Sequence, residues 1–522
     1  MLFNESEPAR GTPPPPPQQP APTRTEQAFS GWFWLSSSAV VQGVVTIGAL
    51  AVLARLLSPT DFGEVSVGML AVNLVQIISQ GLVGPALVQH PRLRPEHIQT
   101  GFALSLFGGI ALQAVLWLAA PAVAVALHAP VLVAVLRALA WFIPIHALGA
   151  VADALLRRDL QYGTIAKIRM VSYALGYGAV GVAVAALGGG LWALVAANLA
   201  QVSLNTALLL RRRPHTKLLR VHPVALRELL SFSGAHCVGM LGNYAATEGA
   251  FFVVAKWLGV TALGLYERAY KLMAMPAIFV GQVLDDVMFP AMAQIQTDRE
   301  LMAKAYRRCV AAAALFALPL TALVLILAPD IVAVLLGSKW GEVVLPFRIL
   351  AVGTLFRASY KVSDSLNRAI GAVYGRAWRE WAYATAVVGG SIFGQGWGLP
   401  GVATAVVLAL VLNFLLTAHL GTRLVSLSWA DYFRAHAAGL RVTAVVAVPA
   451  LAVATAARTF SSLPSVVVLG VTLAGAGAAV APFLFVRSAW LLGPDGHYLL
   501  REAASFVRRR MRRAGPQVPR AI

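Results

Sequence analysis

Four charged residues lie on one face of a single apolar segment, where they are suited to binding an anion. Arg357, Lys361, Asp364 and Arg368 are separated by four, three and four residues, so a helix places them on the same side. A cation at the centre of a bilayer costs roughly 2.5–3.5 kcal/mol on insertion scales, so Arg357 and Lys361 are expected to face a watery cavity or an internal partner. Arg357 has no acidic residue one turn away and is the first candidate for contact with an anion. For Lys361 a structural bridge to Asp364 is the alternative.

A second group of charges lies in the apolar segments 230–255 and 263–289. Arg268 and Lys271 share a helical face, and Glu267 lies one turn before Lys271. These two cations either face a cavity or lie at the membrane interface, and both interpretations remain open. Glu248 is the best acidic candidate for binding a coupling ion, either a proton or sodium. Its alternative role is to neutralise one of the two cations.

Two acid–base pairs have the spacing of ion pairs within a helix. Asp153 with Arg157 and Asp364 with Arg368 are each separated by four residues, which brings opposite charges together on a helix surface. We expect both pairs to be structural and to form a gate at the cytoplasmic ends of their helices. His146, in the same segment as Asp153, is either a proton site or a histidine satisfied within the core.

Two amide side chains occupy matching positions near the middle of apolar segments. These are Gln42 in segment 31–55 and Asn243 in segment 230–255. Each amide either hydrogen-bonds the hydroxyl groups of a sugar-like ligand or ties neighbouring helices together, the latter for about 1 kcal/mol.

The segments that carry these residues are long and apolar throughout the chain. Of 522 residues, 58% are hydrophobic and only 12% are charged, compared with roughly 25% charged in soluble domains. Runs of about 20 residues with few charges are long enough to cross a bilayer as helices. The sequence therefore predicts an all-α polytopic membrane protein, with about fourteen transmembrane helices over residues 31–55, 62–88, 100–126, 131–156, 167–187, 191–210, 230–255, 263–289, 308–328, 343–367, 378–396, 399–419, 439–458 and 464–487.

The distribution of charge predicts the orientation of these helices. The net charge of +20 is concentrated in connectors that follow even-numbered segments, so nucleic acid is not an expected partner. By the positive-inside rule, this alternation places both termini in the cytoplasm. No metal-ligand cluster, nucleophile motif or phosphate-binding glycine loop indicates an enzyme, and no cofactor or metal is expected.

The pattern of segments is repeated within the chain. The stretches "ARLLSPTDFG" (54–63) and "AKWLGVTALG" (255–264) share four identical positions, and residues 137–157 align without gaps with residues 348–368. Each second copy lies six segments after the first. An even displacement preserves the orientation across the membrane, so we expect two parallel six-helix bundles related by an axis along the membrane normal.

The repeat also defines the expected domain boundaries. They are a disordered proline-rich cytoplasmic tail (1–29), an N-terminal bundle (30–210), a basic cytoplasmic linker (211–229), a C-terminal bundle (230–420), an extra helix pair (421–487) and a basic cytoplasmic tail (488–522).

Several motifs resemble one family of membrane transporters. The stretches "ARLLSPTDFG", "GLYERAYKLMAMP", "FPAMAQIQTDRELMAKAYRR" and "LLGSKWGEVVLPFRIL" are similar to those of polysaccharide transporter family flippases. These belong to the multidrug/oligosaccharidyl-lipid/polysaccharide exporter superfamily, and the colanic-acid exporter type is the most similar. The resemblance covers about residues 50–420 and implies the parallel-bundle fold of that superfamily.

The resemblance implies a function that none of the residues specifies alone. It implies translocation of undecaprenyl-pyrophosphate-linked oligosaccharides across the bacterial inner membrane by alternating access. The pyrophosphate and glycan would contact Arg357, Lys361, Arg268, Lys271, Gln42 and Asn243. Candidate protein partners are the polysaccharide polymerase and the chain-length machinery. The alternatives are an ion-coupled drug or metabolite antiporter of the same superfamily, a flippase for a peptidoglycan precursor and, from another class, a membrane glycan polymerase.

Overall fold

The computed structural model describes residues 43, 45–90, 92–216, 218–296, 298–460, 463–486, 488 and 490–497. The first half of the described chain is a series of helices that cross back and forth. They are a helix over Val45–Leu56, α2 (Pro59–Gln89), α3 (Pro95–Ala126), α4 (Leu132–Ala140), α5 (Phe142–Arg158), α6 (Tyr162–Ser172), η1 (Tyr173–Val180), α7 (Gly181–Ala186) and α8 (Leu191–Arg212).

The second half follows the same course and then adds a pair of helices. Its elements are α9 (Pro223–Val253), η2 (Val254–Leu258), α10 (Val260–Gln294), α11 (Arg299–Leu335), η3 (Ser338–Val343), α12 (Val344–Ala369), α13 (Val373–Gly394), η4 (Gln395–Trp397), α14 (Gly398–Leu424), α15 (Trp429–Arg434), α16 (Ala437–Phe460) and α17 (Ser465–Val486).

The helical architecture confirms the predicted fold class of a multi-pass membrane protein. Among the described residues, nine helical stretches are long and apolar enough to cross a membrane. One of them, Gly375–Leu424, has 50 residues. At about 1.5 Å per residue it is too long for one crossing, and it folds as the hairpin of α13 and α14. Several helices extend beyond the predicted bounds, α11 by nine residues at its start, because helices continue into polar sequence where hydropathy ends.

One predicted helix is interrupted. The range 131–156 was expected as a single helix, but it breaks at Trp141 into α4 and α5. Pro144 lies in the first turn of α5, where its missing N–H leaves no hydrogen bond unmade. The break thus places Pro144 where it costs no helical hydrogen bond.

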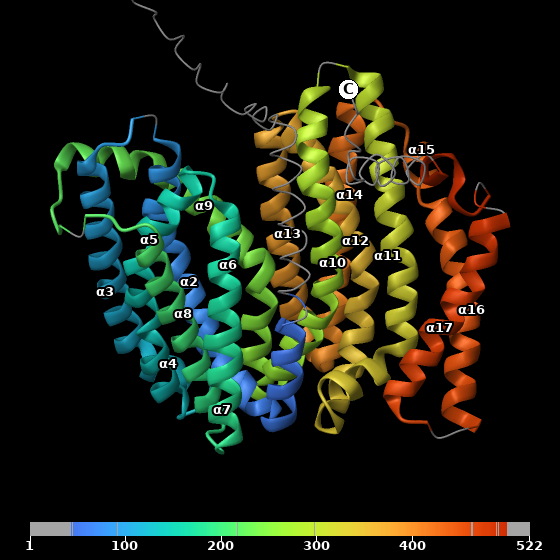
Figure 1. The fold of residues 1–522 in the computed structure, drawn as a ribbon, viewed down its shortest axis with the longest axis horizontal. Coiled ribbons are helices and arrows are strands. Elements are labelled where there is room, and N and C mark those ends of the chain that lie inside the picture. The colour runs from blue at the N-terminus through green and yellow to red at the C-terminus, as the bar shows by residue number, and fades with distance from the viewer. Residues whose placement is uncertain are drawn as a thin grey trace, which may run out of the picture.

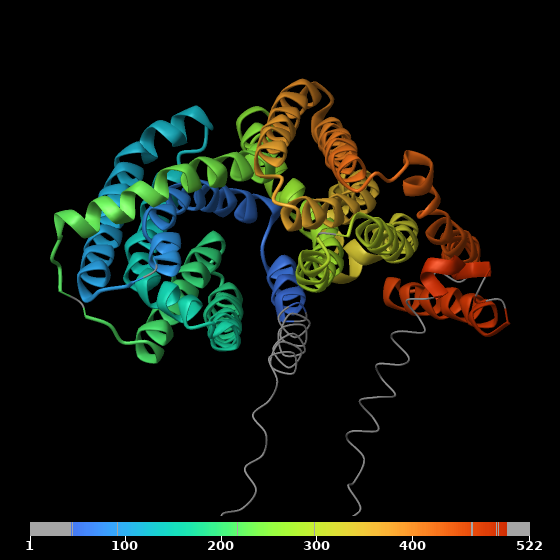
Figure 2. The same ribbon diagram turned by 90° about the horizontal axis from the view of Figure 1, so that it is seen from above.

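The helices form two bundles and a peripheral pair (Figure 1). Seen from above, the helices from α2 to α8 lie on one side and those from α10 to α14 on the other (Figure 2). The helix α9 packs against both α2 and α13 and thereby joins the bundles. The pair α16 and α17 lies at the edge of the molecule beside α11 (Figures 1 and 2).

A single hydrophobic core connects the two bundles at one end. It includes Leu53 and Phe62 from the first half of the chain and Tyr266 and Trp340 from the second. Trp340 is fully buried, and its indole N–H donates to the backbone oxygen of Ala54 at 2.9 Å. Its ring also meets that of Phe62 edge to face, with centroids 5.5 Å apart.

The two copies of the repeated stretch touch each other at this end. The hydroxyl oxygens of Thr60 and Thr261 are 2.9 Å apart. A Cβ added to Gly63 would lie 1.8 Å from the carbonyl oxygen of Val260, and one added to Gly264 would lie 2.0 Å from that of Pro59. Only glycine permits such an approach of two helix backbones. We call Thr60, Gly63, Thr261 and Gly264 the connector contact.

Candidate functional site

A cavity of about 640 Å³ lies between the two bundles. Its lining comes from the helix over 45–56, α2, η1 and α8 of the first bundle and from α9, α10 and α12 of the second. The residues of the connector contact flank Phe62 and Leu263, the first lining residues of α2 and α10. The connector contact therefore lies at one end of this central cavity.

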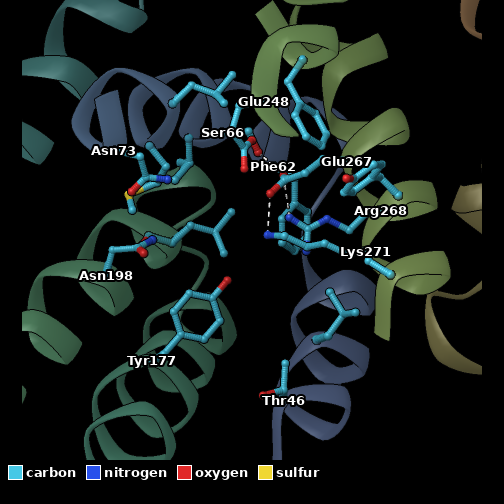
Figure 3. A pocket seen from close by; sticks show the side chains of 18 of the residues that line it. Thr46, Phe62, Ser66, Asn73, Tyr177, Asn198, Glu248, Glu267, Arg268 and Lys271 are labelled. Carbon is cyan, nitrogen blue, oxygen red and sulfur yellow. Dashed lines mark hydrogen bonds and ion pairs between the residues drawn. The ribbon is translucent and has the colours of Figure 1, made fainter. Parts of the chain in front are cut away.

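Glu267, Arg268 and Lys271 lie on one side of the cavity, across from Asn73, Asn198 and Tyr177 (Figure 3). We call Glu248, Glu267, Arg268, Lys271 and Arg357 the charged wall. The helices α9, α10 and α12 position all five, so every charged residue in the described lining belongs to the second bundle. Cations outnumber acids, which favours an anionic ligand.

Glu267 organises the two cations that surround it. Its carboxylate accepts a hydrogen bond from Arg268 Nη2 at 2.8 Å and forms an ion pair with Lys271. It also accepts a bond from the Ser66 hydroxyl across the bundle interface. The Arg268 side chain is only 4% exposed and lies over the Phe62 ring, whereas Lys271 is 48% exposed. Arg268 is thus mainly held within the interface, and Lys271 is the cation that a ligand reaches first.

Arg357 is bound to a neutral partner. Its Nη1 donates to the Tyr270 hydroxyl oxygen at 2.6 Å, and its guanidinium lies 5.4 Å from the centre of the same ring. A guanidinium has five N–H donors in a planar fork. The tyrosine orients this fork without cancelling its charge, which leaves Arg357 suited to bidentate binding of a phosphate group.

Glu248 faces the cavity from α9. Among the described residues it forms no ion pair, because Glu267 occupies the positions beside Arg268 and Lys271. The predicted alternative was that Glu248 neutralises Arg268 or Lys271. The ion pairs of the described residues join both cations to Glu267 instead. The role of Glu248 in coupling stays a prediction.

The opposite wall consists of uncharged polar side chains from the first bundle. We call Asn73, Tyr173, Tyr177, Asn198 and Gln201 the neutral wall. Figure 3 places Asn73, Asn198 and Tyr177 across the open centre from Glu267, Arg268 and Lys271. The two tyrosines lie in η1, a π-helical turn, with their rings stacked at 4.9 Å.

The sequence predicted most residues of the charged wall as site residues and none of the neutral wall. The neutral wall does have a signal in the sequence, because Asn198 and Gln201 are three residues apart and Tyr173 and Tyr177 are four apart. Such spacings place polar groups on one face of an otherwise apolar helix. Tyr270, which orients Arg357, lies on α10 and gave no comparable signal in the sequence.

Three other residues that were predicted to contact the ligand are not in the cavity lining or lie outside the described residues. Lys361 has an exposed side chain, does not line the central cavity, and lies 5.6 Å from the Tyr360 ring. Asn243 is exposed on α9 and is also absent from the lining. Gln42 lies outside the described residues. His146 packs against Phe142 on α5, with ring centroids 6.3 Å apart, and does not reach the cavity.

Both expected acid–base pairs are present. Arg157 Nε donates to Asp153 Oδ2 at 2.6 Å. Arg368 Nε lies 3.3 Å from Asp364 Oδ2. Asp364 also accepts a bond from Arg376 Nε at 2.6 Å, a partner that the sequence did not predict. The proposed bridge from Lys361 to Asp364 is absent from the ion pairs of the described residues, because the two arginines take both carboxylate oxygens.

One group of side chains in the described residues is close enough to hold a metal ion. The ligand atoms of His90, His97 and Glu228 all lie within 4.8 Å of one another. However, His97 Nδ1 accepts a bond from the backbone N–H of Arg94 at 3.0 Å. The proton of the neutral ring is then on Nε2, which lies 2.6 Å from Glu228 Oε2 and donates to it. A protonated nitrogen is not a metal ligand, so we interpret this group as a hydrogen-bonded connection between α3 and α9.

The contact between His97 and Glu228 should make the stability of the folded state depend on pH. The hydrogen bond from His97 holds the pKa of Glu228 below its ordinary value of 4.5, and Arg94 adds to the effect. Near this pKa the folded state therefore binds fewer protons than the unfolded state. The contribution of Glu228 to the stability of the folded state is present above the ordinary pKa and is lost as the pH falls through the lower pKa of the folded state. As the pH is lowered below about 4.5, we expect the melting temperature of Glu228→Gln, measured in detergent, to fall less than that of the wild type.

Glu96→Gln is the matched control, because Glu96 is a half-exposed carboxylate on the same helix as His97, 3.9 Å from Arg94. It should retain the acid dependence of the wild type. Parallel pH profiles for the wild type and Glu228→Gln would show that this contact does not contribute to stability.

Solved structures of exporters and flippases share the arrangement of these helices. The lipid II flippase MurJ, in an inward closed conformation, matches with a TM-score of 0.66 at 13% identity over 86% of this chain and 98% of that chain. An inward-facing multidrug resistance MATE family transporter of the MOP superfamily matches with a TM-score of 0.58 at 16% identity, over 73% and 95% of the two chains. The fold is therefore the one shared by that superfamily.

The chain belongs to the polysaccharide biosynthesis protein family, whose sequence profile matches residues 52–345. Among curated relatives, the teichuronic acid biosynthesis protein TuaB of Bacillus subtilis is 24% identical over 90% of this chain and 97% of its own length. The succinoglycan biosynthesis transport protein ExoT of Rhizobium meliloti is 28% identical over 59% and 62%. The lipopolysaccharide biosynthesis protein WzxC of Escherichia coli is 21% identical over 64% and 68%. These matches confirm the family that the motifs indicated.

Proposed function

We propose that the protein is a flippase. It moves oligosaccharides linked to undecaprenyl pyrophosphate from the cytoplasmic to the periplasmic leaflet of a bacterial inner membrane. The process supplies exopolysaccharide, capsule or O-antigen biosynthesis. The observation that carries this proposal is the charged wall of the central cavity, where Arg268, Lys271 and Arg357 lie between two bundles. The names of the relatives TuaB, ExoT and WzxC support a polysaccharide pathway.

The charges explain why an anionic carrier is preferred to a cationic drug. A pyrophosphate offers several oxygens to N–H donors, and charge-assisted bonds to it are stronger than neutral ones. Glu267 balances only part of the positive charge around it, so a cationic substrate would meet net repulsion. A polar cavity shields the pyrophosphate and sugars from lipid, which would otherwise leave those groups without hydrogen-bond partners.

The distribution of basic connectors supports an orientation for the transport cycle. With both termini in the cytoplasm, the connector contact lies at the periplasmic end. Separation of Thr60 from Thr261 would then open the cavity to the periplasm. We assign Glu248 as the candidate site for a coupling proton or sodium ion, since it faces the cavity without an ion-pair partner among the described residues.

Leaflet exchange in liposomes tests the function. The substrate is undecaprenyl pyrophosphate that carries a fluorescently labelled oligosaccharide, and dithionite, which does not cross the membrane, bleaches only the outer leaflet. Bleaching should stop at about half of the signal without protein and approach completion with it. Bleaching that stops at half with several glycans, and with imposed proton and sodium gradients, would contradict the proposal. Gradient-driven movement of a lipophilic cation would then favour an antiporter, and elongation of the glycan would favour a polymerase.

A further inference from the structure

The central cavity separates charged from uncharged polar groups. Every charged residue in its described lining comes from α9, α10 or α12. The lining residues of the first bundle include amides and hydroxyls but no charged side chain in the part of the chain that is described. A ligand that contacts both walls must therefore carry an anionic part and a neutral part rich in hydrogen-bonding groups.

The backbone around η1 is built to bring four polar side chains of the neutral wall together. A Cβ added to Gly176 would lie 2.4 Å from Gln201 Cα, so the glycine allows α8 to approach η1 closely. This approach places Gln201 and Asn198 beside the stacked rings of Tyr173 and Tyr177. π-Helical turns are rare and occur often at functional sites. Tyr173 and Tyr177 of the neutral wall are thus carried by a π-helical segment of eight residues.

The chemistry of the neutral wall suits sugars. Asn198 lines the cavity, and its Nδ2 donates to the Leu194 backbone oxygen at 2.7 Å, while its Oδ1 is an acceptor group. Gln201 offers both a donor and an acceptor, and the tyrosine hydroxyls offer either. Stacked tyrosine rings add flat apolar faces that end in a polar group. Neutral donors, acceptors and ring faces match the hydroxyls and apolar faces of a glycan, and they would bind pyrophosphate poorly.

We propose that the neutral wall is the surface that recognises the glycan and determines which oligosaccharides are transported, while the charged wall holds the pyrophosphate common to all such carriers. This inference rests on the proposed flippase function and extends it. A site that hydrogen-bonds substrate hydroxyls discriminates strongly against analogues that lack them, since its own polar groups are then left unpaired. The first bundle therefore selects the sugar, and the second binds the carrier.

The test compares binding of two probes to the full-length protein in nanodiscs. One probe is undecaprenyl pyrophosphate without sugar, and the other is the same carrier with an oligosaccharide repeat unit, in three versions of different sugar composition. The variants Asn198→Leu and Gln201→Met nearly preserve side-chain volume and remove hydrogen-bonding groups. We expect each to weaken binding of the preferred glycan-bearing carrier by about tenfold, the effect of one lost hydrogen bond with its partner left unpaired. Binding of the bare carrier should change by less than about twofold.

Two further variants complete the comparison. Ser203→Ala is the matched control, because Ser203 is exposed on the same helix and does not line the cavity, and it should bind both probes as the wild type does. Arg357→Ala should weaken binding of both probes alike.

The inference is wrong if the neutral-wall variants weaken both probes equally, if they weaken neither, or if the wild type binds no glycan-bearing carrier more tightly than the bare one. In each of these cases binding of the bare carrier would still support the flippase. If the wild type binds neither probe, the proposed function itself fails and the inference fails with it.

Discussion

Replacement of Arg357 by alanine should reduce the affinity for undecaprenyl pyrophosphate by roughly thirtyfold or more. This corresponds to about 2 kcal/mol, the lower end of the cost of removing one partner from a buried, hydrogen-bonded charge pair. The physical reason is that Arg357 directs an oriented guanidinium toward the cavity, with a neutral tyrosine as its only side-chain hydrogen-bond partner among the described residues. Binding is measured in nanodiscs, and leaflet exchange of the glycan-bearing carrier should fall in parallel.

Three comparisons define what Arg357 contributes. Arg357→Lys keeps the charge and loses the planar fork, so it should recover only part of the affinity. Tyr270→Phe keeps the ring and removes the bond that orients the guanidinium, and its effect should be intermediate. Lys361→Ala removes a cation one turn further along α12 that does not line the cavity, and it should bind nearly as the wild type does. Equal losses for Arg357→Ala and Lys361→Ala would show that overall positive charge, and not this site, attracts the carrier.

A disulfide between positions 60 and 261 should abolish transport and should do so reversibly. The hydroxyl oxygens of Thr60 and Thr261 are 2.9 Å apart, so side chains at these two positions meet across the bundle interface, as a disulfide requires. Thr60→Cys with Thr261→Cys, in a chain whose Cys237 and Cys309 are replaced by alanine, would join the bundles at the connector contact. If that contact must open in each cycle, the oxidised protein cannot release its substrate, and a reducing agent should restore exchange.

The controls for this experiment separate the cross-link from the substitutions. Each single cysteine variant should transport at the rate of the cysteine-free protein under oxidising conditions, and binding of the bare carrier should survive oxidation of the double variant. Exchange at an undiminished rate in fully cross-linked protein would show that the connector contact stays closed throughout the cycle, and that the cavity opens by another route.

Much of this molecule is encoded in local patterns. Apolar length, the alternation of basic connectors and the repeat of "ARLLSPTDFG" were enough to predict an all-helical membrane protein with two parallel bundles, because each signal depends only on residues that are close in the sequence. The same signals identified Arg268, Lys271, Arg357 and Glu248, since an ionisable residue inside a span is costly and needs a polar environment. The ion pairs of Asp153 and Asp364 followed from helical spacing alone.

Helical spacing alone cannot distinguish two residues on the same helix face when they contact different parts of the tertiary structure. Lys361 and Arg357 share a predicted face, yet only Arg357 lines the cavity, because α10 supplies Tyr270 beside it. Asp364 found a second partner in Arg376, which reaches it after the chain turns at Gly371, where φ is +75°.

Local patterns in the chain are sufficient to identify a two-bundle membrane protein of a polysaccharide transporter family with cations inside its second bundle. Local patterns do not show that the two copies of the repeated stretch face each other, with Thr60 against Thr261 and the backbones of Gly63 and Gly264 in close approach. The packing also brings five charged residues from the second bundle and five neutral polar ones from the first to the lining of one cavity. The reason is physical: helix periodicity tells which residues share a face, but which faces meet depends on the packing of helices that are separated by a hundred residues or more of chain.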